Sequence, residues 1–372
     1  MAYSSNTTIS VIIVGASLSG LMTGIAMAKS GFQVTILERF DAKPRSGAVL
    51  QVDTYESDTT ETAKYLRKLA SKGKKSVEAW SAVHLRLQNS AISTKNITLH
   101  YNTRIISADQ NAESAWVKTS DNVIFKADLV VGADGYKSII RKYVADEKPE
   151  AQYAGYMIWL AILDEKEIPL EHWPTADATT SMLNGIGDFL LGSVVEGMSG
   201  SKNIGERRLS WAWYDNTSNE TLHQLGCVDD KNIAQHTLTS SQIPEDVLTD
   251  LQRKAIIRWP QPWLSVVLNC IKSKNIIGIP ISEYTPYRMV NNRMVIIGDA
   301  AHVMSPITAM GFNAALEDAS KIVEFVQKNI QSHSIPKALV DFEKHRLKAV
   351  QKLVRAGQSF SQSFGKNLSK KN

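Results

Sequence analysis

Residues 9–28 constrain the fold of this chain most, because they have the order of a strand, a glycine-rich turn and a helix. A β-branched apolar run reaches Val14, a Gly/Ser turn occupies 15–20, and a helical pattern continues to about 29–31. A second apolar run over 33–37 ends on Glu38. This is the first half of a βαβ unit closed by an acid about 20 residues on, a pattern that predicts a dinucleotide site.

Each position of this turn has its own physical role. Gly15 lets the chain turn sharply off the strand, and Gly20 lets the helix pack closely on the sheet. The helix N-terminus offers free N–H groups to a pyrophosphate, and Glu38 can accept hydrogen bonds from ribose hydroxyls. The middle glycine of the usual G-x-G-x-x-G pattern is Ser17 here. The alternative is a buried parallel strand and helix with no ligand. A signal peptide is disfavoured because the first ten residues hold no Lys or Arg.

Composition places the chain among ordinary globular proteins. Its 372 residues suffice for two domains, and 43% of them are hydrophobic. The net charge of +5 comes without a basic stripe interleaved with aromatics, so we expect no nucleic-acid partner. We expect no membrane span, because Gly and Ser crowd the middle of the apolar run at 9–28. Cys227 and Cys270 have no metal-ligand spacing, which predicts no metal site and two buried thiols in a reducing cytoplasm.

Two further stretches repeat the order of strand end, glycine turn and helix. A buried strand over 129–131 leads into Gly132, Asp134 and Gly135. Asp134 therefore stands where α/β sheets place ligand contacts, although it can also cap the following helix. A third strand over 294–297 ends on Gly298-Asp299, and a loop with Pro306 and Gly311 precedes a helix that begins at 312 or 313. That helix start is suited to an anionic group.

Residues 151–275 differ from the rest of the chain in having recurrent strand patterns separated by turns. This pattern predicts a mostly antiparallel sheet with helices, inserted between segments of the nucleotide fold. Strand patterns cover 153–163, 188–195 and 208–214, and a polar helical pattern covers 232–253. Most tryptophans lie here: Trp159, Trp173, Trp211, Trp213, Trp259 and Trp263. For each of them, core packing is preferred over a role in the wall of a substrate pocket. A last helix over about 334–364 is expected to pack on the nucleotide fold, followed by a flexible tail, 366–372.

The three motifs, GASLSG with Glu38, GADG at 132–135 and GDAAH at 298–302 with Pro306 and Gly311, together resemble the group A flavoprotein monooxygenases. The resemblance implies an α/β fold of the p-hydroxybenzoate hydroxylase type. A Rossmann-like (GR2-type) FAD-binding domain would comprise 1–150 and 276–365. An inserted, mostly antiparallel β-sheet substrate domain would comprise 151–275, and a C-terminal helix would complete the fold.

The resemblance also implies the positions that hold FAD. These cofactor-binding positions are Gly15, Ser17, Leu18, Ser19, Gly20, Glu38, Arg39, Arg45, Arg86, Asp134, Gly298, Asp299, Pro306, Gly311, Phe312 and Asn313. Pro306 would lie beside the flavin ring where oxygen reacts, the one position with a catalytic role. Arg45 and Arg86 have solvent exposure as their alternative, and His302 is expected to be structural.

The activity implied is hydroxylation of a small aromatic or N-heteroaromatic molecule by O2, with FAD as cofactor, NAD(P)H as co-substrate and a flavin hydroperoxide as the oxygen donor. The alternatives are an oxidase, dehydrogenase or reductase of the same fold, a flavoprotein without catalysis, and a plain NAD-dependent dehydrogenase. The sequence identifies no catalytic base; by residue type and region only, the candidates are Tyr153, Tyr156, Tyr214 and Tyr287. Either a monomer or a homodimer is compatible with the sequence.

Overall fold

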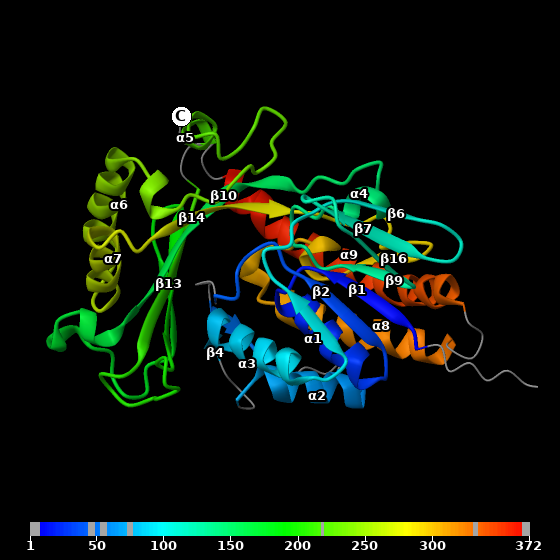
Figure 1. Cartoon of the computed structure of the whole chain (residues 1–372). Helices are drawn as coiled ribbons and strands as arrows, with labels where there is room; N and C mark the ends of the chain where they lie inside the picture. The colour runs from blue at the N-terminus through cyan, green and yellow to red at the C-terminus, as the bar shows by residue number, and fades with distance from the viewer. Residues whose placement is uncertain are drawn as a thin grey trace, which may run out of the picture.

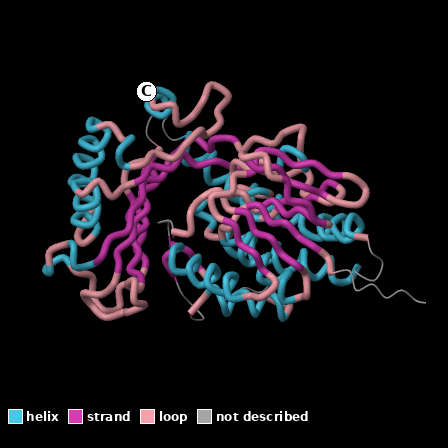
Figure 2. Tube along the Cα trace, viewed as in Figure 1, coloured by secondary structure: helices cyan, strands magenta, loops and turns pink. Residues whose placement is uncertain are grey.

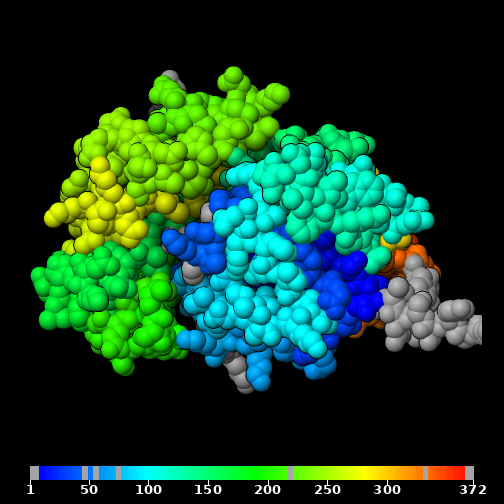
Figure 3. Space-filling view, viewed as in Figure 1, coloured from blue at the N-terminus to red at the C-terminus, as the bar shows by residue number. Residues whose placement is uncertain are grey.

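The computed structural model describes residues 8–43, 49–52, 58–72, 77–216, 219–329 and 334–366. Two large β-sheets dominate the molecule, one in each half (Figure 1). In the space-filling view, the green surface around one sheet and the blue surface around the other are separated by a furrow (Figure 3).

The first large sheet has six strands in the order β15-β16-β9-β1-β2-β5. Its strands are β1 (Ser10–Val14), β2 (Gln33–Leu37), β5 (Ile97–His100), β9 (Leu129–Gly132), β15 (Val290–Asn291) and β16 (Met294–Ile296). Every pairing is parallel except β15 with β16. The carboxyl ends of β1, β2, β9 and β16 therefore meet at one edge, which brings the three sequence motifs and Glu38 together.

Helices cover one side of this sheet, and a small antiparallel sheet lies on the other side (Figures 1 and 2). The helices are α1 (Leu18–Lys29), α2 (Glu61–Ala70), α3 (Trp80–Ser93) and α8 (Gly311–Asn329). The small sheet comprises β6 (Ile105–Gln110), β7 (Ala115–Thr119) and β8 (Ile124–Ala127). Both sides of the parallel strands are thus covered, which explains their unbroken apolar runs.

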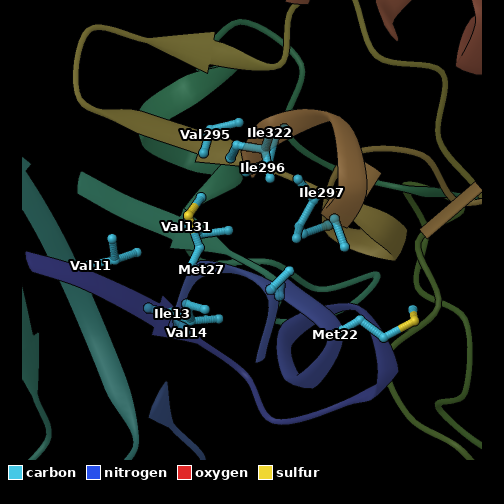
Figure 4. Packing of buried hydrophobic residues seen from close by; sticks show 14 of the residues in the cluster. Val11, Ile13, Val14, Met22, Met27, Val131, Val295, Ile296, Ile297 and Ile322 are labelled. Carbon is cyan, nitrogen blue, oxygen red and sulfur yellow. The ribbon is translucent and has the colours of Figure 1, made fainter. Parts of the chain in front are cut away.

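The core of this half forms where α1 and α8 pack on the sheet. Figure 4 shows Val11 and Ile13 of β1 and Val131 of β9 beside Met27 of α1, with Ile322 of α8 above them. All five side chains are buried, at 1% exposure or less. Burial of this kind is the main stabilising contribution to such a fold.

The second large sheet is antiparallel, in the order β11-β12-β13-β10-β14. Its strands are β10 (Gln152–Asp164), β11 (Thr180–Asn184), β12 (Asp188–Val195), β13 (Arg208–Asp215) and β14 (Ile277–Glu283). Helices α6 (Glu245–Arg258) and α7 (Trp263–Lys272) cover one face, and the long helix α9 (Ile335–Lys366) reaches the other (Figure 1). The remaining elements include β3 (Val49–Gln51), β4 (Val77–Ala79), α4 (Arg141–Val144) and α5 (Asn219–Gln224).

The predicted fold class is confirmed: a mixed α/β chain has a parallel sheet and a separate antiparallel one. The helix predicted over 232–253 is wrong in its first half, because residues 228–238 form isolated bridges and α6 begins only at Glu245. The Asn/Asp-rich turn there makes its own side-chain hydrogen bonds, as at Asp229. The domain boundaries stay predictions; β14, placed with the FAD domain by sequence, pairs with β10 in the antiparallel sheet.

Among the described residues, no helix combines the length and the apolar character that a bilayer crossing requires. Both cysteines are buried and unpaired, as predicted.

Candidate functional site

A pocket of about 600 Å³ lies at the carboxyl edge of the parallel sheet. The ends of β1, β2 and β9 form one part of its wall, and α3 with residues 101–106 forms another. Five of the predicted cofactor positions line it, namely Gly15, Ser17, Glu38, Arg39 and Asp134. The first two motifs and the acid after β2 are therefore brought to one cavity.

The tight turn after β1 requires glycine at both ends. Gly15 has φ of +102°, and a Cβ there would come within 2.4 Å of the Ala133 carbonyl oxygen. At Gly20 a Cβ would come within 2.0 Å of the Gly15 carbonyl oxygen. Any larger residue at either position would separate α1 from the loop, so the predicted steric roles of both glycines hold.

Ser17 precedes α1 as its N-cap residue, and its exposed side chain makes no capping hydrogen bond. The N–H groups of the first helical turn have no partner within the helix, so they are available to an anion. Leu18 and Ser19 are buried behind this turn and do not line the pocket. They can serve a cofactor through backbone groups alone.

Glu38 is fixed by two backbone donors. Its Oε2 accepts from the N–H of Ala16 at 2.8 Å, and its Oε1 accepts from the N–H of Phe40 at 3.0 Å. Each carboxylate oxygen keeps lone-pair capacity for a further donor. The guanidinium of Arg39 lies over the ring of Phe40, 4.5 Å from its centroid, beside the same cavity.

Asp134 lines the pocket and binds the turn that precedes α4. It accepts hydrogen bonds from the hydroxyl of Ser138 and from the N–H of Ile139, the latter at 2.6 Å. Burial raises the pKa of Asp134, and these hydrogen bonds oppose that rise. The capping role is wrong, because Ile140 is the N-cap residue of α4 and no side chain caps it, and the ligand contact of Asp134 stays a prediction.

The third motif packs directly on the first. A Cβ on Gly298 would lie 2.8 Å from the side chain of Ser19, so the loop after β16 touches α1 beside the glycine turn that follows β1. Asp299 keeps an exposed side chain although residues 294–298 and 300–305 are buried. The surrounding protein raises the pKa of Asp299 by desolvation, against the opposing effect of His302 and Arg141. Neither Gly298 nor Asp299 lines the 600 Å³ pocket.

Pro306 and the start of α8 present open surface. Pro306 is exposed while its neighbour Ser305 is fully buried, and a Cβ on Gly311 would meet nothing within 4 Å. Phe312 and Asn313 are buried in the first turn of α8. The backbone at the N-terminus of this 19-residue helix thus borders free space.

A buried ionic network holds the third motif in place. Asp318 accepts from the Gly298 N–H at 2.9 Å and from Arg346 Nε at 2.8 Å, and lies 2.6 Å from His302 Nε2. Burial favours the neutral carboxyl, but His302 and Arg346 together hold the pKa of Asp318 at about 2. This geometry supports the structural role expected for His302.

Of the two arginines predicted near the flavin or pyrophosphate, the structure describes Arg86 but not Arg45. Arg86 is partly exposed and does not line the pocket, and its guanidinium bonds to Glu78 and to the carbonyl of Ala70. Arg45 lies outside the described residues. No group of three or more His, Cys, Asp or Glu that could hold a metal ion occurs in the described ranges.

Four basic residues that the sequence did not single out bind the motif segments or the helices beside them. Arg141 is buried and donates to the carbonyls of Asp299 and Ala300, at 3.3 and 3.0 Å, which joins the second motif to the third. The other three are Arg67, which bonds Asn313, Arg346, and His84, which contacts the glycine turn. Only an Arg or His within an apolar helical face could have signalled them, and that pattern does not identify a partner.

The four candidate tyrosines separate into three places. Tyr156 and Tyr214 lie on the face of the antiparallel sheet toward α9, and the Tyr156 hydroxyl bonds the Ser305 hydroxyl at 2.6 Å. Tyr153 belongs to the core on the opposite face. Tyr287 is exposed and donates toward Asp146, away from the motif loops.

Comparison with known proteins gives matches along most of the chain. A family model described as FAD binding domain matches residues 8–76 and 268–357, and one described as FAD binding domain-like matches 153–274. The chain is 25% identical to 2,6-dihydroxypyridine 3-monooxygenase of Paenarthrobacter nicotinovorans, with 92% of this chain and 88% of that protein covered. It is 22% identical to a FAD-dependent urate hydroxylase of Klebsiella pneumoniae, with 96% and 91% covered.

Solved structures agree at the level of the fold. The structure of 2,6-dihydroxypyridine-3-hydroxylase from Arthrobacter nicotinovorans matches with a TM-score of 0.77 at 20% identity, and the match covers 97% of this chain and 94% of that one. Klebsiella pneumoniae HpxO, complexed with FAD and uric acid, matches with a TM-score of 0.68 at 17% identity, with 96% and 89% covered.

Proposed function

Because this chain belongs to the group A FAD-dependent monooxygenases, we propose that it uses FAD, O2 and NAD(P)H to hydroxylate a small aromatic or heteroaromatic molecule. In balanced form, the substrate C–H, O2, NAD(P)H and one proton give the hydroxylated product, NAD(P)⁺ and water. The relatives named above carry names of this reaction class, acting on a dihydroxypyridine and on urate.

The observation that carries the proposal is the meeting of three motif loops at one sheet edge. Glu38 and Asp134 share the 600 Å³ pocket, and Gly298 of the third loop touches Ser19 beside it. A dinucleotide is long enough to start in the pocket and pass the α1 N-terminus toward the third loop. The residues along this path suit the parts of FAD. Glu38 is an acid for the ribose, the free N–H groups at the start of α1 suit the pyrophosphate, and the backbone at Gly311 is open.

The pocket would hold the adenosine half of FAD. There Glu38 is positioned to accept from ribose hydroxyls, and the turn with Gly15 and Ser17 is positioned for the pyrophosphate. Arg39 beside them supplies a positive charge near the phosphates.

The flavin end would be held by the third loop and α8. FAD supplies the redox chemistry there, taking a hydride from the nicotinamide and activating dioxygen for the substrate. The N–H groups of Gly311, Phe312 and Asn313 would stabilise negative charge on the ring through the helix dipole. Exposed Pro306 would border the side of the ring where oxygen reacts, and Asp299 would contact the ribityl or pyrophosphate part.

The substrate would lie between Pro306 and the α9-facing side of the antiparallel sheet. Tyr156 connects these two parts through its hydrogen bond to Ser305. Burial raises the pKa of Tyr156 to about 12, so its hydroxyl stays protonated and acts as a hydrogen-bond donor or acceptor rather than as a base.

The test is a turnover assay of purified, FAD-loaded protein over a panel of hydroxypyridines, purines and hydroxybenzoates, with NADH and NADPH compared. We expect NAD(P)H oxidation that a substrate stimulates, and label from ¹⁸O2 in the product. Substrate-stimulated oxidation without label in any product would instead indicate an oxidase, dehydrogenase or reductase. Protein that gains no yellow chromophore with FAD would contradict the proposal entirely.

A further inference from the structure

His84 of α3 is buried against the glycine turn, and one of its ring nitrogens has no partner. Its Nε2 lies 2.9 Å from the carbonyl oxygen of Ala16, and the side chain is 8% exposed. A carbonyl oxygen can only accept, so Nε2 carries the proton and Nδ1 carries a lone pair in the neutral ring. Nδ1 makes no hydrogen bond to any described residue.

The ring is kept neutral and fixed in orientation. Burial lowers the pKa of His84, while the Ala16 hydrogen bond and the charge of Glu38 oppose that change. Trp80 stacks on the imidazole with ring centroids 4.7 Å apart and an interplanar angle of 15°. A buried acceptor without a partner is costly, so a donor from a ligand would relieve that cost.

The pocket is the place from which such a donor can come. His84 and Trp80 both line it, together with Glu38. Ala16 is held from two sides, because Glu38 accepts from its N–H and His84 donates to its carbonyl oxygen. Both side chains are therefore fixed against a single residue.

Two acceptor residues on the wall of one pocket select the chemistry of the ligand. A phosphate offers only acceptor oxygens and negative charge. Glu38 would repel it, and Nδ1 of His84 could form no hydrogen bond with it because both atoms are acceptors. A vicinal diol offers two hydroxyl donors to two acceptors. The adenosine ribose of FAD carries such a diol.

We propose that His84 Nδ1 accepts a hydrogen bond from a hydroxyl of the adenosine ribose of FAD, which makes His84 a second ribose-binding residue beside Glu38. This inference rests on the proposed function for the presence of FAD. It assigns a role to α3, on which the sequence pattern predicted only Arg86 as a cofactor contact.

Two substitutions distinguish the acceptor Nδ1 of His84 from the contact that its Nε2 makes with the Ala16 carbonyl. His84→Gln keeps a donor at the ε position for Ala16 but removes the δ acceptor, whereas His84→Asn keeps an acceptor at the δ position and loses the bond to Ala16. The exposed His223 on α5 provides the matched control, His223→Gln. Apoprotein of each variant is titrated with FAD, ADP and FMN, and thermal unfolding of the apoprotein is recorded alongside.

We expect His84→Gln to bind FAD and ADP about three- to tenfold more weakly, as the loss of one hydrogen bond predicts. FMN, which lacks the adenosine, should bind as tightly as it does to the wild type. His84→Asn should retain more FAD affinity than His84→Gln although its apoprotein unfolds at a lower temperature.

The opposite ranking, with His84→Asn weaker than His84→Gln, would show that the Ala16 contact matters and would overturn the proposal. Unchanged FAD and ADP affinity in His84→Gln would overturn it as well, as would an equal loss for FMN. Wild-type apoprotein that binds no FAD but binds ADP would contradict the proposed function while leaving the ribose contact of His84 measurable with ADP.

Discussion

The two faces of the antiparallel sheet use the same five strands for different purposes. On the face covered by α6 and α7, alternate residues contribute tryptophans to a core, with Trp159, Trp211 and Trp213 packed beside Trp259 and Trp263. On the face toward α9, the intervening positions contribute Tyr156, Phe189 and Tyr214, together with Glu283 at the end of β14. The first face is apolar except at one edge, where Asp215 and Asp188 accept from the Nε1 groups of Trp159 and Trp213. The other face holds buried hydroxyl groups and the carboxyl of Glu283 among its aromatic residues.

The difference shows how strand alternation separates stability from function. Residue 157 and residue 156 are neighbours in sequence, yet Met157 enters the tryptophan core and Tyr156 contacts the loop before Pro306. A face that must only exclude water can use the largest apolar side chains. The face proposed to meet the substrate has polar groups with defined partners, and those partners come from other segments, here Ser305 and Ser361.

The largest effect should follow truncation on the helix-covered face. Trp211 is 1% exposed and its Nε1 donates to Cys270 Sγ of α7 at 3.4 Å. Trp211→Ala should lower the free energy of unfolding by about 3–5 kcal/mol, because it leaves a large cavity in a closed core. Urea unfolding measures this loss, with Trp211→Phe as a control that keeps most of the volume. A loss below about 1 kcal/mol would mean that this face is not a core.

FAD binding by folded Trp211→Ala protein tests whether the tryptophan face affects stability alone. Trp211→Ala protein that remains folded at low temperature should bind FAD as the wild type does, since no tryptophan of this face lines the pocket at the parallel sheet.

An intermediate effect is expected on the other face. Tyr156→Phe removes the hydroxyl that bonds buried Ser305, so Ser305 loses this partner and the free energy of unfolding should fall by about 1–2 kcal/mol. Because Ser305 precedes Pro306, the fraction of NAD(P)H oxidation that ends in hydroxylated product should fall as well. Product formed per NAD(P)H consumed measures this coupling.

The control for Tyr156→Phe is its combination with Ser305→Ala. If the hydrogen bond is the cause, the double variant should lose no more stability and coupling than Tyr156→Phe alone. Additive losses, or a Tyr156→Phe enzyme with wild-type coupling, would show that this face has no specific contact with the oxygen-reacting region.

Much of this architecture could be predicted from the sequence because local patterns carry it. Apolar runs of strand length, glycines at strand ends and Glu38 after β2 predicted the parallel sheet and the residues that now line its pocket. The positions that need glycine are visible for the same reason, since the steric demand at Gly15 and Gly20 arises within one turn.

The parts that could not be predicted depend on segments far apart in the chain. Arg86 stays a predicted cofactor position, but its partners Glu78 and the Ala70 carbonyl could not be read from the sequence. His84, only two residues earlier, reaches Ala16 because α3 packs on α1. The direction of a side chain on a helix follows from the packing of that helix, and no local pattern encodes which neighbour it meets.

The smallest effect concerns the buried carboxyl of the α9-facing side. Glu283 Oε1 accepts from the Ser361 hydroxyl at 2.7 Å, and burial raises the pKa of Glu283 above 4.5 although this hydrogen bond opposes the rise. The folded state therefore binds the proton more tightly than the unfolded state. The contribution of Glu283 to stability is present below pH 4.5 and is lost as the pH rises through its folded pKa.

Glu283→Gln should abolish this dependence while keeping an acceptor for Ser361. The variant should match the wild type in urea unfolding near pH 4 and become slightly more stable than it near pH 8. Exposed Glu171→Gln serves as the control and should show no such divergence. A wild type that gains stability over Glu283→Gln as the pH rises would mean that a positive partner stabilises the carboxylate. The α9-facing side would then be ionic at Glu283, as the other face is where Arg258 pairs with Asp188, and charge would not distinguish the two faces.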